Sequence, residues 1–180
     1  MQPSWFAQYS ELWAKIEKNV RMLKLQRAAF FPHGKLTFTS EELAAELRPA
    51  LEAIAAQVTR DQRLLAVVTV GEQLHPEQDR KEQQRAASTA LYAMPFMSIP
   101  GLLRARQYHN EVIADIARAS NAILIEGHEQ IPGTSVYYAD TSHFKPAGSR
   151  LMAERVSAVL IHAPDVRRLF ETRQELCRGS

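Results

Sequence analysis

The sequence is poor in cysteine and in long apolar runs, and both shortages exclude whole classes of protein. Cys177 is the only cysteine, so no disulfide framework is available and the cellular compartment stays open. The longest strongly apolar run, LLAVVTV, is far too short to cross a bilayer. The opening residues, MQPSWFAQYS, lack the basic and then apolar pattern of a signal peptide. We therefore expect a soluble protein, with no signal peptide, no transmembrane segment and no recognisable targeting signal in this chain.

Neither sign of charge is in large excess. The 22 Lys and Arg and the 20 Asp and Glu give a net charge of +2, and they are scattered, so we expect no nucleic-acid partner. The histidines are not clustered and none has partner spacing that suggests a metal site, so we expect no metal and no cofactor. Hydrophobic residues make up 46% of the 180 positions, which is ample for the core of one domain or a large part of one.

Helical periodicity dominates the first third of the chain. Apolar residues from Ser4 to about Phe30 recur at helical spacing, with basic residues on the wetter side. Such a helix can bind membranes, but we interpret its basic side as a solvated face. A second helix is expected after Thr39, which has capping-box spacing to Glu42. Pro49 lies inside this helix and is expected to bend or split it.

The rest of the chain alternates strand-like and helical segments. Residues 64–70 form a continuous apolar run that predicts a strand buried on both faces, and residues 122–125 predict a second buried strand. Helices are expected over 102–120 and from 146 to about 161. This alternation predicts an α/β fold with a parallel sheet. Residues 71–101, between the first predicted strand and the helix predicted over 102–120, are expected to be a functional loop, a lid or a mobile segment. The Met, Phe and Tyr residues of this segment either line an apolar pocket or pack the loop onto its own apolar side chains.

The stretch YYADTSHFKPAGSRLMAERV places Asp140 and His143 three residues apart, directly before the last helix. An Asp in such a turn can accept a hydrogen bond from an imidazole and fix its tautomer, as a base for a serine or cysteine nucleophile requires. Spacing alone favours helix capping, because Asp and Ser are common caps and Pro146 suits a first helical turn. The residues that follow the pair shift the weight toward catalysis.

Those residues resemble the last sequence block of the SGNH (GDSL-type) serine hydrolase family. In that block Asp-x-x-His is followed by an aromatic residue, a Gly and a helix, here Asp140, His143, Phe144, Gly148 and LMAERV. The resemblance covers roughly residues 40–160. It implies a flavodoxin-like three-layer α/β/α fold with a parallel sheet, of which this chain holds only the later strands. It also implies that His143 is the catalytic base and Asp140 its orienting partner.

The nucleophile half of that family's machinery is missing from this sequence. There is no Gly-Asp-Ser and no Gly-x-Asn-Asp, and the only asparagines are Asn19, Asn110 and Asn121. Ser10 lies among helical residues, with no strand before it and no glycine to make a tight turn, so it is not expected to be the nucleophile. The resemblance therefore implies a serine supplied from outside this chain, by a missing N-terminal segment or a partner chain, and an isolated chain that is inactive.

We accordingly divide the chain into a helical insertion or extension (1–38), an α/β part (39–162) and a C-terminal tail (163–180). His128 and Glu129 follow the second strand, where sites gather in parallel sheets, and are candidates for substrate contact. The expected function is the C-terminal part of an SGNH-type esterase that acts on an ester or an acylated glycan. The alternatives are a glycan O-acetyl transferase or esterase of the same family, and a non-catalytic α/β module that binds a partner, its Asp–His pair a relic or a cap.

Overall fold

The structure is a computed structural model that describes residues 13, 15–17, 19–20, 39–127 and 130–178. The helix predicted from Ser4 to about Phe30 lies mostly outside these residues, and those of its residues that are described are helical. In chain order the other elements are α3 (Ser40–Arg60), β1 (Ala66–Val68), α4 (Arg80–Ala86), α5 (Ser88–Ala93), α6 (Ile99–Ser120), β2 (Ile123–Ile125), α7 (Pro146–His162) and α8 (Pro164–Arg178).

The described residues form a mixed α/β fold that is mostly helical, with one small two-stranded parallel sheet. The predicted parallel pairing is confirmed, with Ala66 opposite Ile123 and Val68 opposite Ile125. Both strands are shorter than the apolar runs that predicted them. Beyond β1, the backbone of Val70 hydrogen-bonds to the buried side chain of Asn110 and not to a strand. The Asn110 amide accepts from the Val70 N–H at 2.7 Å and donates to the Val70 carbonyl at 3.1 Å.

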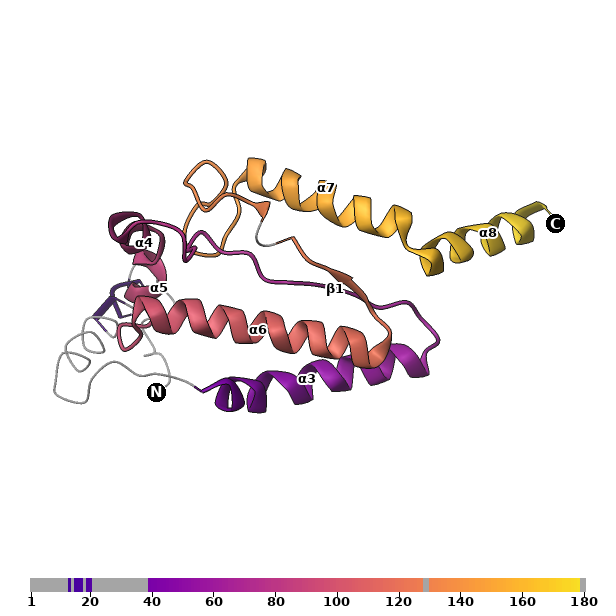
Figure 1. The fold of residues 1–180 in the computed structure, drawn as a ribbon, viewed down its shortest axis with the longest axis horizontal. Helices are drawn as coiled ribbons and strands as arrows, with labels where there is room; N and C mark the ends of the chain where they lie inside the picture. Colours follow the sequence, from indigo (N-terminus) through magenta and orange to yellow (C-terminus); the bar gives the residue numbers. More distant parts are fainter. Residues whose placement is uncertain (1–12, 14, 18, 21–38, 128–129, 179–180) are drawn as a thin grey trace.

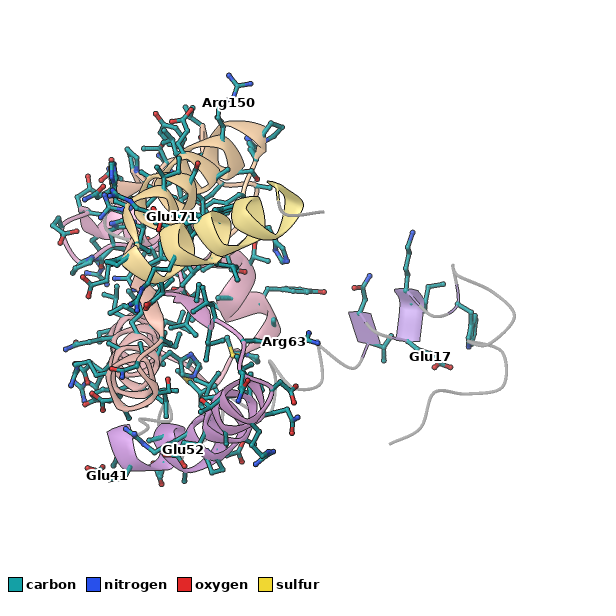
Figure 2. The ribbon with its side chains drawn as sticks, turned by 90° about the vertical axis from the view of Figure 1, so that its right-hand side faces the viewer. Glu17, Glu41, Glu52, Arg63, Arg150 and Glu171 are labelled. Atoms are coloured by element: carbon teal, nitrogen blue, oxygen red, sulfur yellow. The ribbon has the colours of Figure 1, made fainter. Side chains whose placement is uncertain are left out.

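Helices lie on both sides of this sheet (Figure 1), with α3 and α6 below the strands and α7 and α8 above them in that view. Helix α6 contacts both strands, whereas α7 contacts β2. The same two groups of helices separate in the view from the side (Figure 2). The prediction that the first strand is buried on both faces is wrong for the described residues: Ala66 and Val68 are exposed, because α7 covers the neighbouring strand instead.

One of the two core clusters joins α3 to α6. Its buried residues are Ala55, Val112 and Ile116, with Leu47, Leu51 and Leu65 packed against them. The predicted capping box at the start of α3 is confirmed, since Thr39 and Glu42 each accept from the backbone N–H of the other. Pro49 does not split the helix: α3 runs through it as one element.

The segment between β1 and α6 is neither structureless nor open. It contains the short helices α4 and α5, and it packs on its own apolar side chains. The buried residues of this second cluster are Leu74, Ala86, Ala87, Met97 and Leu102, with Leu91 and Phe96 against them. The sequence left open whether the Met, Phe and Tyr residues of this segment line a pocket or pack the loop down. Met97 and Phe96 belong to the cluster on which the loop packs down.

Helix α7 ends within one residue of its predicted end, but helix α8, which follows it, was not predicted. The tail over 163–180, for which no helix was predicted, contains α8, and it begins at Pro164 directly after the buried Ala163. Among the helices that the structure describes, none combines the length and the apolar character needed to cross a membrane.

Candidate active site

Asp140 and His143 lie in a tight loop between β2 and α7, on the carboxyl side of the sheet. The loop is closed by backbone hydrogen bonds from the Ala139 N–H to the His143 carbonyl (2.8 Å) and from the Lys145 N–H to the Tyr137 carbonyl (2.8 Å). Inside it, one Asp140 carboxylate oxygen accepts from the backbone N–H groups of Ser142 (3.0 Å) and His143 (2.9 Å). This is an Asx turn, which fixes the carboxylate relative to the loop backbone.

The imidazole of His143 is held by the same carboxylate. Its Nδ1 lies 2.9 Å from Oδ1 and 2.8 Å from Oδ2 of Asp140. The backbone N–H groups of Ser142 and then His143 lower the pKa of Asp140, and the His143 side chain adds to this. Asp140 therefore stays ionised to a pH below the usual range of an Asp, and the hydrogen bonds to its carboxylate weaken only as the pH falls through this lowered pKa. The His143 side chain is 79% exposed, so the imidazole lies at the surface with its Nδ1 held by Asp140.

The alternative interpretation of the pair as a helix cap is wrong. The N-cap of α7 is Lys145, which makes no side-chain capping bond, and Pro146 occupies the first turn as predicted. The bonds of Asp140 go to Ser142 and His143 and not to the first turn of α7. The Asp140 carboxylate therefore stabilises the backbone of the loop and orients the imidazole of His143.

Thr141, between the two candidate residues, ties their loop to the rest of the domain. Its hydroxyl donates to the Ala86 carbonyl (2.7 Å) and accepts from the Ala90 N–H (3.2 Å). Its own carbonyl accepts from the Gln73 N–H at 2.8 Å. Because Thr141 is buried, these bonds are shielded from water and hold the Asp–His pair on α4 and α5.

Gly148 has a steric role in the first turn of α7. A Cβ at this position would lie 2.3 Å from the Tyr137 carbonyl oxygen and 2.8 Å from Cδ1 of Phe144. Phe144 in turn packs on the buried Tyr138, with ring centroids 4.9 Å apart. The aromatic residue and the glycine that follow Asp-x-x-His thus bring the helix against the base of the loop.

Sequence reasoning did not single out a group of three ionisable side chains, the buried Tyr138 and the half-buried Glu72 and Arg106. Burial raises the pKa of Glu72, an effect that Arg106 partly offsets. Burial also raises the pKa of Tyr138 to about 12, with Arg106 opposing the shift and Glu72 adding to it. Arg106 donates to the Leu74 carbonyl at 2.6 Å, and the Tyr138 hydroxyl has no hydrogen-bond partner among the described residues. The three side chains are positioned by the loop after β1, by α6 and by the loop after β2.

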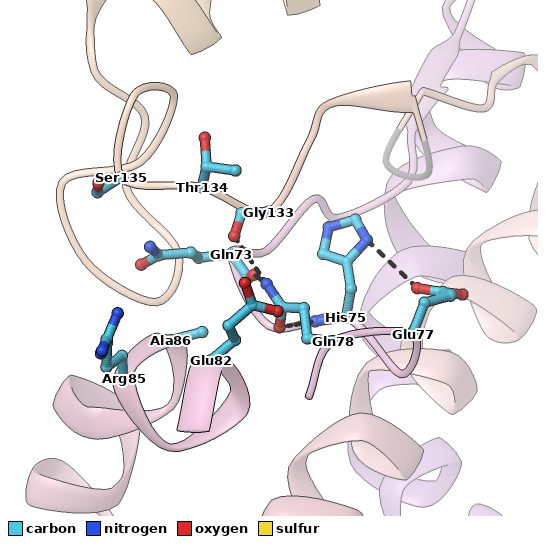
Figure 3. Close-up of a pocket in the computed structure, with 10 residues that line it drawn as sticks. All are labelled: Gln73, His75, Glu77, Gln78, Glu82, Arg85, Ala86, Gly133, Thr134 and Ser135. Atoms are coloured by element: carbon cyan, nitrogen blue, oxygen red, sulfur yellow. Dashed lines mark hydrogen bonds and ion pairs between the residues drawn. The ribbon is translucent and has the colours of Figure 1, made fainter. Parts of the chain in front are cut away.

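A cavity of about 450 Å³, lined mainly by polar residues, is shown in Figure 3. It lies between the loop after β1, helix α4 and the loop after β2, and shares Gln73 and Ala86 with the contacts of Thr141. Gln78 joins two of these walls, because its side-chain amide donates to the carbonyls of Gln73 (3.0 Å) and Gly133 (2.7 Å). A Cβ at Gly133 would meet the Gln73 carbonyl oxygen at 2.3 Å, which accounts for the glycine.

The other sequence candidates separate into two groups. Ser10, His128 and Glu129 lie outside the described residues. His75 is a satisfied histidine, since its Nε2 lies 2.9 Å from the Glu72 carbonyl oxygen. Asn110 and Asn121 have structural roles, the first on the Val70 backbone and the second as the left-handed C-cap of α6. In the part of the chain that the structure describes, no group of His, Cys, Asp and Glu side chains is arranged to hold a metal ion.

Sequence reasoning found the Asp–His pair but missed Thr141, Gln73 and Gln78. The contacts that join Thr141 to Ala86 and Gln73, and Gln78 to Gly133, connect residues far apart in the sequence, so no spacing signal exists for them. Comparison with protein-family models, with curated proteins and with solved structures found no match to this chain.

Proposed function

We propose that this chain is the C-terminal part of an SGNH-type serine ester hydrolase and supplies its base, His143, and the orienting carboxylate, Asp140. The observation that carries the proposal is the Asp140–His143 pair, with both carboxylate oxygens within 2.9 Å of Nδ1 and the imidazole exposed. A histidine held in this way has its Nε2 left to accept a proton from a nucleophile. In this proposal the sheet is completed into a flavodoxin-like three-layer α/β/α sandwich.

The chemistry follows from that geometry. A serine hydroxyl from outside the chain attacks the carbonyl carbon of an ester while Nε2 of His143 takes its proton. The carboxylate of Asp140 holds the ring and stabilises its charged form. The proton then passes to the leaving alcohol, and a water molecule repeats the sequence to release the acid. The oxyanion donors, whose electrostatic contribution is usually the largest, come with the missing segment.

The test is turnover of p-nitrophenyl acetate, first by the chain alone and then by an extended chain, in which the segment that carries the serine is joined to it. We expect the chain alone to be no faster than histidine in solution, and the extended chain to be active. His143→Ala should reduce the activity of the extended chain on the order of 10⁴-fold or more. Asp140→Asn should cost as much or less, because Asp140 only orients and stabilises the base.

Two outcomes contradict the proposal. Strong turnover by the chain alone that survives His143→Ala removes His143 from the chemistry. Turnover by the chain alone that is lost with Ser10→Ala makes Ser10 the nucleophile, and a segment outside the chain is then not required.

A further inference from the structure

The two sides of β1 differ sharply in burial. Along residues 64–70 the side chains of Leu65, Val67 and Thr69 are half-buried or buried, and Leu65 packs on the α3–α6 core. The alternate residues Leu64, Ala66, Val68 and Val70 are all exposed, with relative exposures of 45% for Leu64, 37% for Val68 and 40% for Val70. Side chains alternate between the faces of a strand, so these four residues form one apolar stripe on the α7 side.

Part of this stripe forms the floor of an apolar groove. The groove has a volume of about 780 Å³ and runs between Leu64, Ala66 and Ile123 on one side and helices α7 and α8 on the other. Its helical wall carries Leu160, Ile161, Leu169 and Phe170, and the last three are 61%, 56% and 61% exposed. An exposed apolar surface of this kind marks an interaction site.

The direction of the backbone N–H and C=O groups of β1 indicates which kind of partner can bind beside it. The Ile123 N–H donates to the Leu65 carbonyl and the Thr69 N–H to the Ile125 carbonyl, so Leu65, Val67 and Thr69 direct their backbone groups toward β2. By the alternation of a parallel ladder, Ala66 and Val68 direct theirs to the opposite edge. The sheet of the described residues has two strands, and no third strand among them pairs with that edge. An unpaired row of N–H and C=O groups is a template for a strand, and a helix or a lipid chain does not satisfy it.

Strand direction connects this edge to the candidate site. The Asp140–His143 loop lies on the carboxyl side of the sheet, and loops that follow parallel strands meet at that same side. A strand parallel to β1 on its free edge therefore delivers its own following loop toward His143. An antiparallel strand delivers that loop to the far end.

We infer that the free edge of β1, with the groove beside it, binds an apolar β-strand, parallel to β1, from the segment that carries the nucleophile. This inference rests on the proposed function and names the surface through which the two halves join. The strand pairs with the backbone of Ala66 and Val68, and the polypeptide that follows it covers the exposed stripe and the wall of α7 and α8.

Hydrogen exchange of individual amides tests the inference. In the chain alone, the amides of Ala66 and Val68 should exchange at least about tenfold faster than those of Val67 and Thr69, which are bonded to β2. In the extended chain, which carries the segment with the nucleophile, the two edge amides should slow to the rates of their neighbours. Edge amides that stay fast in the extended chain overturn the inference.

Variants of the edge give the second measurement. Val68→Pro removes an N–H that faces the free edge, so the chain alone should keep its circular dichroism, whereas the extended chain should lose at least about tenfold in turnover. Val67→Pro is the matched control, because it removes an N–H that faces β2 and should disturb the chain alone. Should Val68→Pro fail to fold, Val68→Lys keeps the N–H and places a charge on the stripe, and it should weaken the extended chain in the same direction.

The outcomes separate this inference from the proposed function. Edge amides that become protected without any ester turnover support the docking surface and reject the hydrolase. Turnover that appears while the edge amides stay fast rejects the docking surface alone. A chain that sediments as a dimer, with both edge amides already protected and released by Val68→Pro, overturns the inference because the edge then belongs to a second copy.

Discussion

The loops at the carboxyl side of the sheet and the α7 side of β1 are built in opposite ways. The loops are held by polar contacts between distant segments: Thr141 bonds to Ala86, Ala90 and Gln73, and Gln78 bonds across to Gly133. The α7 side of β1 presents exposed apolar side chains, and no strand among the described residues pairs with the edge of β1 that faces away from β2. The contrast teaches that long-range polar contacts fix the loop of the candidate base, whereas the apolar surface beside β1 is left exposed among the described residues. Substitutions in the two regions should therefore differ greatly in cost.

Among substitutions at the loop, the largest expected loss of stability is at Gly148, where helix α7 meets the loop. Gly148→Ala adds a Cβ only 2.3 Å from the Tyr137 carbonyl oxygen, and a backbone atom cannot move aside as a flexible side chain does. We expect a loss of about 3 kcal/mol in the free energy of unfolding, although Ala is normally the better helix former. Urea unfolding followed by circular dichroism measures it.

Gly127→Ala is the matched control for this change. Its added Cβ would meet Cγ of Arg155 at 3.1 Å, and the long Arg155 side chain can adjust, so the cost should stay below about 1 kcal/mol. Equal costs at Gly148 and Gly127 would show that the close approach of α7 to the loop does not govern stability.

A smaller effect is expected at Thr141. Thr141→Val preserves the shape of the side chain but removes the hydroxyl that pairs with the Ala86 carbonyl and the Ala90 N–H, so the chain should lose about 1–3 kcal/mol. Thr141→Ser keeps the hydroxyl and should restore most of this.

Nuclear magnetic resonance of the loop gives a readout beyond stability. The Ser142 and His143 amides, which donate to Asp140, should shift in Thr141→Val and return in Thr141→Ser. Unchanged amide shifts in Thr141→Val would remove Thr141 as a positioning residue for the Asp–His pair.

The smallest effect is expected on the bare surface. Phe170 is 61% exposed, so Phe170→Ser should change the free energy of unfolding of the chain alone by no more than about 0.5 kcal/mol. Leu74→Ala, at a side chain that is fully buried, should cost about 2–5 kcal/mol. The same urea experiment measures both. A large cost for Phe170→Ser would mean that α8 is part of the core and that the comparison between the two regions fails.

Local patterns in the sequence were sufficient for several features. The apolar runs predicted two parallel strands, and the Thr39–Glu42 spacing predicted a helix start. The spacing of Asp140 and His143 by itself favoured a helix cap, and only the residues that follow the pair favoured an oriented imidazole. Each depends on neighbours within a few residues or on one apolar run. Helix α4 was missed although its signal is present, since Asp79 and Glu82 form a capping box.

Tertiary structure alone decided which contacts hold the loop and which surface stays bare. Thr141 and Ala86 are 55 positions apart, and Val70 and Asn110 are 40 apart, so the sequence carries no periodic signal that links them. The burial of β1 was mispredicted for the same reason: an apolar run reports what a strand can bury, whereas the neighbouring elements determine what it does bury. The two apolar runs were suited to two buried strands, but the packing of the described residues leaves β2 half-buried or buried and one face of β1 exposed.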